Sequence, residues 1–133
     1  MSRRFCLGMM IVGCLLAIGC AEKAPPPNLP TVHKVTGKVI DKKTGQPITE
    51  GAVQFESLAT QAQVAIADIQ PDGTFSLNTF VDGHKLEGTV PGPQRVTFMP
   101  RAGEDQAAAI PVTLKETFEV KEGANDFKIE VER

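Results

Sequence analysis

Apolar and polar residues alternate along most of the chain beyond position 32, in short runs that turn-forming residues separate. The clearest run is the last one, NDFKIEVER (125–133), in which Phe127, Ile129 and Val131 alternate with charged side chains. An alternation of period two places the apolar side chains on one face, which is typical of a β-strand with one buried face. We therefore predict strands at about 35–40, 51–58, 62–69, 74–80, 94–99, 110–120 and 125–131.

Turn signals separate these runs. The stretch QPDGTF (70–75) places Pro71 before Asp72 and Gly73, and this pattern favours a tight turn because proline fixes φ and Asp-Gly accepts the geometry. A strand with one apolar face needs a second layer to cover it, so we expect two sheets packed together. The prediction is an all-β fold, a single antiparallel β-sandwich of about seven strands. Its core should contain the six phenylalanines beyond the leader, which are Phe55, Phe75, Phe80, Phe98, Phe118 and Phe127.

The first 19 residues have the layout of a secretory signal peptide. Arg3 and Arg4 precede an uncharged apolar run of about 15 residues, which ends in small residues. Spanning a bilayer takes roughly 20 apolar residues, so a transmembrane anchor is the weaker interpretation. We predict a signal peptide over 1–19, which would be absent from the mature chain.

Cys20 stands at the end of this leader, in the stretch AIGC (17–20). This stretch resembles the lipobox of bacterial lipoproteins, in which the cysteine becomes the first residue of the mature chain and carries acyl chains. Two or more acyl chains hold a protein stably at a membrane. The resemblance implies lipidation at Cys20, although IVGC (11–14) offers Cys14 as a less favoured alternative. A mature chain with one cysteine cannot form an internal disulfide.

Residues 20–31 follow as a tether, with four prolines between Ala21 and Thr31. Proline-rich segments are extended at about 3.1 Å per residue, so the tether could hold the domain of residues 32–133 up to ~30 Å from its anchor. The formal charge is −2 for the whole chain. Removing Arg3 and Arg4 leaves 12 basic side chains against 16 acidic ones, a charge of −4. This balance argues against a nucleic-acid partner, which usually requires a basic surface.

The domain itself resembles the carboxypeptidase regulatory-like domains. The resemblance rests on VTGKVIDKKTGQPITEGAVQFES (35–57), DIQPDGTFSLNT (68–79) and VPGPQRVTF (90–98). It implies a transthyretin-like sandwich of seven strands. With its leader, the chain also resembles the small lipoproteins of planctomycete-type bacteria that are built from one such domain. The shared motifs are turn and core positions, so they indicate a fold more than a function. The chain departs from the family pattern at Gln94, where an aromatic residue is common.

Residues capable of chemistry are few and scattered. His33 and His84 are far apart and match no metal-binding spacing, and Asp68 with Asp72 supplies too few oxygens for Ca²⁺. We predict no cofactor, no metal site and no catalytic residues. Long loops on a rigid scaffold often carry binding function, so the longest irregular stretch, 81–93, is the first place to look for a binding loop, with a passive crossover between strands as the alternative. Its candidate residues are Asp82, Gly83, His84, Lys85, Gly88 and Gly92.

These observations predict a non-enzymatic, lipid-anchored protein of the cell envelope with a structural or protein-interaction role. It would be exported and held at the outer or the cytoplasmic membrane, with its domain in the periplasm or at the cell surface. Two alternatives remain open at this point. The domain could bind a glycan or another small ligand, or it could be an accessory subunit of an envelope transporter or enzyme.

Overall fold

The structure, a computed structural model, describes residues 28–60, 63–102 and 109–133. These residues form strands and turns without any helix, so the predicted all-β class is confirmed for the described chain. The described residues contain nine strands, two more than the seven predicted, because 74–80 divides into two strands and a further strand lies inside the predicted loop 81–93. They are β1 (Val35–Asp41), β2 (Ala52–Ser57), β3 (Val64–Asp68), β4 (Thr74–Ser76), β5 (Asn78–Val81), β6 (His84–Glu87), β7 (Gly92–Met99), β8 (Val112–Val120) and β9 (Asn125–Val131).

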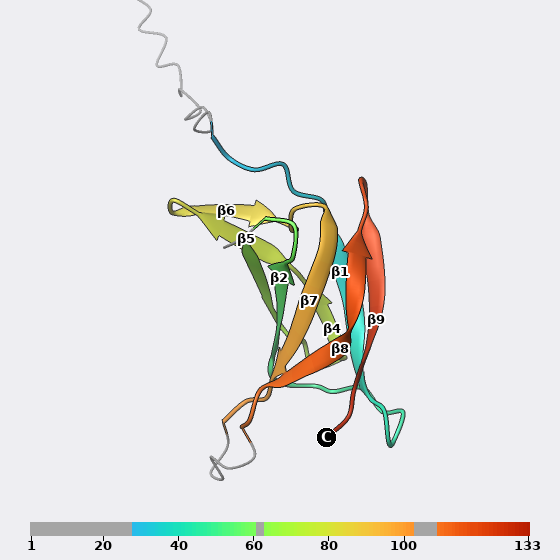
Figure 1. The fold of residues 1–133 in the computed structure, drawn as a ribbon. Coiled ribbons are helices and arrows are strands. Elements are labelled where there is room, and N and C mark those ends of the chain that lie inside the picture. Colours follow the sequence, from blue (N-terminus) through green and yellow to red (C-terminus); the bar gives the residue numbers. More distant parts are fainter. Residues whose placement is uncertain (1–27, 61–62, 103–108) are drawn as a thin grey trace, which may run out of the picture.

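The described strands form two sheets (Figure 1). The smaller sheet has the order β4-β1-β9, and the larger has the order β6-β5-β3-β2-β7-β8. The prediction of a purely antiparallel arrangement is wrong at one place, because β1 and β9 run parallel, with Val35 opposite Asn125 and Asp41 opposite Val131. Parallel neighbours need a long crossover connection, and here the chain between β1 and β9 provides it.

The core lies between the two sheets and follows the predicted alternation. Val35 and Val39 of β1 are fully buried, as are Val53 and Phe55 of β2. Four phenylalanine rings meet there: the ring of Phe55 lies 6.0–6.2 Å from the others, with Phe118 on its own sheet and Phe75 and Phe127 on the facing sheet. Aromatic pairs at such distances pack favourably. The two sheets are therefore joined through one aromatic cluster, as in a β-sandwich.

Two turns of the domain, the one after β1 and the predicted one at 70–75, have side-chain hydrogen bonds that explain their sequences. The carboxylate of Asp41 accepts the backbone N–H of Lys43 at 2.8 Å and that of Thr44 at 3.3 Å, which closes the turn after β1. The carboxylate of Asp72 accepts the hydroxyl of Thr74 at 2.6 Å and its N–H at 3.0 Å. Asp72 therefore stabilises a turn, as such Asx arrangements generally do.

The N-terminal end of the described chain is fastened to the sandwich before β1 begins. The N–H of His33 donates to the carbonyl oxygen of Thr89 at 2.8 Å, and the N–H of Thr89 donates back at 3.1 Å. The N–H of Gly123 also donates to Nδ1 of His33, at 3.2 Å. Figure 1 shows that this entry point and the C-terminus lie at opposite ends of the sandwich. The segment preceding β1 thus joins the domain at one defined end.

Candidate functional site

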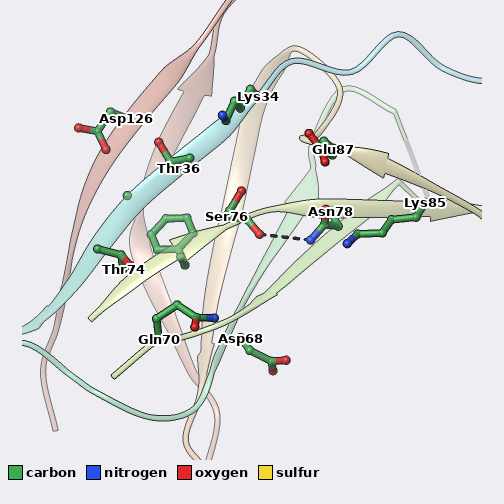
Figure 2. Close-up of a pocket in the computed structure, with 12 residues that line it drawn as sticks. Lys34, Thr36, Asp68, Gln70, Thr74, Ser76, Asn78, Lys85, Glu87 and Asp126 are labelled. Atoms are coloured by element: carbon green, nitrogen blue, oxygen red, sulfur yellow. Dashed lines mark hydrogen bonds between the residues drawn. The ribbon is translucent and has the colours of Figure 1, made fainter. Parts of the chain in front are cut away.

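Between β4 and β5 the chain passes from the smaller sheet to the larger one within a single residue, Leu77, and this corner shapes a groove. β4 pairs with β1 in the smaller sheet, whereas β5 pairs with β3 and β6 in the larger one. Leu77 between them is buried; its N–H donates to the oxygen of Val35 at 2.9 Å, and its oxygen accepts the N–H of Gly88 at 2.8 Å. Because the strand turns away from one sheet toward the other, an open groove of about 700 Å³ lies at the corner (Figure 2).

The groove is lined mainly by polar side chains from both sheets. Three carboxylates and two ammonium groups line it in the described chain, together with hydroxyls and amides. In Figure 2, Lys34, Thr36 and Asp126 of the smaller-sheet side lie across from Asn78, Lys85 and Glu87 of the hairpin β5–β6. The polar residues are Lys34, Thr36, Asp68, Gln70, Thr74, Ser76, Asn78, Lys85, Glu87 and Asp126. Such a set can donate and accept many hydrogen bonds without strong selection for either charge.

The outer face of the larger sheet, next to this groove, carries exposed apolar side chains. Phe80 on β5 is 60% exposed, and Val64 and Ile66 on β3 are 39% and 38% exposed. Ile66 lies opposite Asn78 of β5, and Phe80 lies opposite Lys85 of β6. Continuing the register by one residue from Ala65 opposite Thr79 brings Val64 beside Phe80. We call Val64, Ile66 and Phe80 the apolar face. It meets the groove at Asn78 and Lys85.

The exposure of Phe80 corrects the prediction that all six phenylalanines fill the core. Phe75, Leu77 and Thr79 are buried at alternate positions along the strand pair, and Phe80 is out of phase with them. It therefore points outward, away from the facing sheet. The sequence carries a signal for this, since Phe80 follows Phe75 by an odd number of residues, and strand alternation therefore places the two side chains on opposite faces.

The predicted irregular loop 81–93 is instead largely a β-hairpin, and this prediction is corrected. Val81 pairs with His84, and the two residues between them have positive φ, 49° at Asp82 and 80° at Gly83. Tight two-residue hairpin turns demand this geometry, and Asp-Gly is among the dipeptides that adopt it most readily. A cross-strand hairpin satisfies backbone hydrogen bonds that an irregular loop would leave to water. The dipeptide Asp82-Gly83, which lies between two short strand-forming runs, is the sequence signal for this hairpin.

The six candidate residues of that stretch have separate surroundings. Lys85 lines the groove, whereas Asp82 and Gly83 form the hairpin turn. Gly88 bonds to Leu77 at the corner, and Gly92 begins β7. The half-buried His84 does not line the groove. The groove residues of the smaller sheet were missed, because nothing in the sequence indicates that positions 34, 36 and 126 approach the hairpin.

Within the described ranges, no three histidine, cysteine, aspartate or glutamate side chains lie close enough together to hold a metal ion. Cys20, the predicted lipidation site, lies outside the described residues, as does the alternative Cys14. None of the described residues form a helix long and apolar enough to cross a bilayer.

No protein-family model matches the chain, and no curated protein matches it. Among solved structures, the chain is similar to a crystal structure of (S)-allantoin synthase, with 14% identity and a TM-score of 0.46. The match covers 77% of this chain and 41% of that protein, so the chain spans less than half of that protein's length.

Proposed function

We propose that this protein is a non-enzymatic, lipid-anchored domain of the bacterial cell envelope, which binds other envelope molecules through the outer face of its larger sheet. The observation that carries the proposal is the grouping of Val64, Ile66 and Phe80 on one sheet face beside the corner groove. Grouped apolar side chains on the surface mark interaction sites more often than scattered ones do. The lipid anchor rests on the leader and Cys20 alone.

The tether and the hydrogen bonds at His33 fit this role together. A proline-rich segment keeps an anchor and a domain apart. The described chain is held to the sandwich from His33 onward, through Thr89 and Gly123. Any pull on the tether would therefore reach the rigid sandwich within two residues of its predicted end.

For the fold family, we propose the transthyretin-like sandwich of the carboxypeptidase regulatory-like domains. The family's turn motifs support this assignment, because they coincide with turns of the chain. Asp41, Thr44 and Gly45 lie in the turn after β1, and Asp72 with Gly73 lies in the turn before β4. The two-sheet architecture is compatible with it as well.

Metabolic labelling with palmitate tests the anchor. We expect label on the wild-type chain and on Cys14→Ser, and none on Cys20→Ser. Equal labelling of the wild type and Cys20→Ser would refute Cys20 as the acylated residue. Intact-mass measurement of the mature protein would show independently whether it begins at residue 20.

Co-purification from native membranes tests the binding role. We expect an envelope component in stoichiometric amount with the wild type and with Ile110→Ala, and loss of that component with Phe80→Ala. Ile110 is a matched control because it is also exposed, at 69%, and precedes β8 outside the apolar face. Recovery that does not depend on Phe80 would refute the face as the binding surface. A transporter or enzyme subunit among the recovered components would favour the accessory-subunit alternative.

A further inference from the structure

The outer face of the hairpin β5–β6 brings an aromatic ring together with hydrogen-bonding side chains. Asn78 and Phe80 lie two positions apart on β5 and therefore share a face, about 7 Å apart along the strand. Glu87 lies opposite Asn78, and Lys85 lies opposite Phe80. The four side chains thus form a small square with one apolar corner, at the mouth of the groove.

This combination fits the chemistry of a sugar chain. A pyranose ring has faces of C–H groups and an edge of hydroxyl groups. The negative face of an aromatic ring attracts the slightly positive hydrogens of such C–H groups. The hydroxyl edge needs both donors and acceptors. Asn78 offers both, Lys85 donates, and Glu87 accepts.

The charges of the groove point to an uncharged sugar. Asp68, Glu87 and Asp126 would repel an anionic chain, while Lys34 and Lys85 would repel a cationic one. Side chains of both signs that line one groove can instead bond neutral hydroxyls, since each hydroxyl donates and accepts.

The surroundings of the apolar face disfavour a large protein interface. Such interfaces usually have a core depleted in charged residues. Here Val64 lies opposite Glu56, which forms a salt bridge with Arg95 at 3.5 Å. Lys85 lies on the other side, opposite Phe80. The apolar face is therefore bordered by charges on both sides along this row. Its width suits one or two sugar rings better than the core of a protein interface.

We infer that the corner groove and the adjoining Phe80 bind a neutral oligosaccharide. One sugar ring packs on the exposed ring of Phe80, and the following ring lies in the groove, where Asn78, Lys85 and Glu87 bond its hydroxyls. This inference rests on the proposed binding role of the same face and specifies the class of ligand. The envelope molecule that the domain binds would then be a polysaccharide.

Isothermal titration calorimetry of the full chain tests the inference. The protein is purified from membranes in a zwitterionic detergent, because a sugar-based detergent would compete. The probes are cellohexaose, maltohexaose and the hexamer of N-acetylglucosamine, with hexagalacturonate as the charged comparison. We expect at least one neutral hexamer to bind with a Kd at or below about 1 mM, and hexagalacturonate to bind at least about tenfold more weakly.

Variants then locate the site. Phe80→Ala should weaken binding of that hexamer at least about tenfold, as truncation of a central aromatic contact does. Phe80→Tyr should retain binding, and Ile110→Ala should leave it unchanged. Both residues are largely exposed, so the urea midpoints of the variants should stay near that of the wild type and exclude misfolding as the cause.

Several results would overturn the inference. They are a failure of all three neutral hexamers to bind with a Kd at or below about 1 mM, tighter binding of hexagalacturonate, or unchanged binding by Phe80→Ala. A dimer that Phe80→Ala converts to a monomer, without sugar binding, would make the face a self-interface instead. Failure here differs from failure of the proposed function, because palmitate labelling and Phe80-dependent co-purification would both still succeed.

Discussion

Replacing Gly37 by alanine tests whether the aromatic core is as tightly closed around β1 as the structure indicates. Gly37 is a buried strand residue whose backbone conformation any residue can adopt. A Cβ placed there would lie 2.7 Å from two carbons of the Phe75 ring and would overlap the backbone oxygen of Phe127 on the parallel neighbour β9. A single added methyl group would therefore clash with both an aromatic ring and a backbone atom.

The expected cost follows from which of these atoms can move. Overfilling a packed core usually costs about 1–3 kcal/mol, when side chains can shift to make room. The oxygen of Phe127 belongs to a seven-residue parallel pairing between β1 and β9, so relief there requires separating two strands. We therefore expect a loss of about 3 kcal/mol or more in the free energy of unfolding. For a domain of this size, that loss lowers Tm by roughly 12–24 °C.

Urea unfolding followed by circular dichroism measures this loss, and Gly45→Ala provides a matched control. Gly45 has open space around its Cβ but a φ of 72°, so alanine there costs about 1 kcal/mol through backbone conformation alone. Combining Gly37→Ala with Phe75→Leu should recover only part of the loss, because the contact with Phe127 remains. If Gly37→Ala lowers the free energy of unfolding no more than Gly45→Ala does, β1 does not pack as closely against β9 and Phe75 as the structure shows.

Two further predictions concern polar groups of the domain. The N–H groups of Lys43 and Thr44, with Arg133, hold the pKa of the Asp41 carboxyl below its ordinary value. The ionised form therefore stabilises the fold at neutral pH, and this contribution is lost as pH falls from about 4 toward the lowered pKa. We expect Asp41→Asn to be less stable than the wild type in urea unfolding at pH 7, with the difference shrinking by pH 3; a constant difference would contradict the cause. Gln94 is fully buried, its Nε2 donates to the oxygen of Val90 at 3.0 Å, and its Oε1 has no partner among the described residues. Gln94→Met should change stability by about 1 kcal/mol or less, whereas Gln94→Glu should cost at least about 3 kcal/mol at pH 7 because it buries a charge facing a carbonyl. Equal effects of the two substitutions would show that water reaches this site.

The sequence determined the class of fold and the position of most strands. An alternation of period two identifies which residues share a face, and this held for Val35 and Val39 on β1 and for Ile129 and Val131 on β9. The turns were equally local, since Asp41 and Asp72 bond to N–H groups within three residues of themselves. Features that depend on the nearest few residues can be predicted from a single sequence. The leader, Cys20 and the tether also belong to the sequence alone, and their roles remain predictions.

Only the tertiary structure decided which strands are neighbours and where the candidate site lies. The parallel pairing of β1 with β9 joins residues about 90 positions apart, and no local pattern specifies such a contact. The groove forms because the chain changes sheets at Leu77, which brings Asp126 and Thr36 to face Lys85 and Glu87. Alternation places side chains on faces but does not say which sheet a face belongs to or what lies across from it. That information exists only once distant strands have packed on a common core.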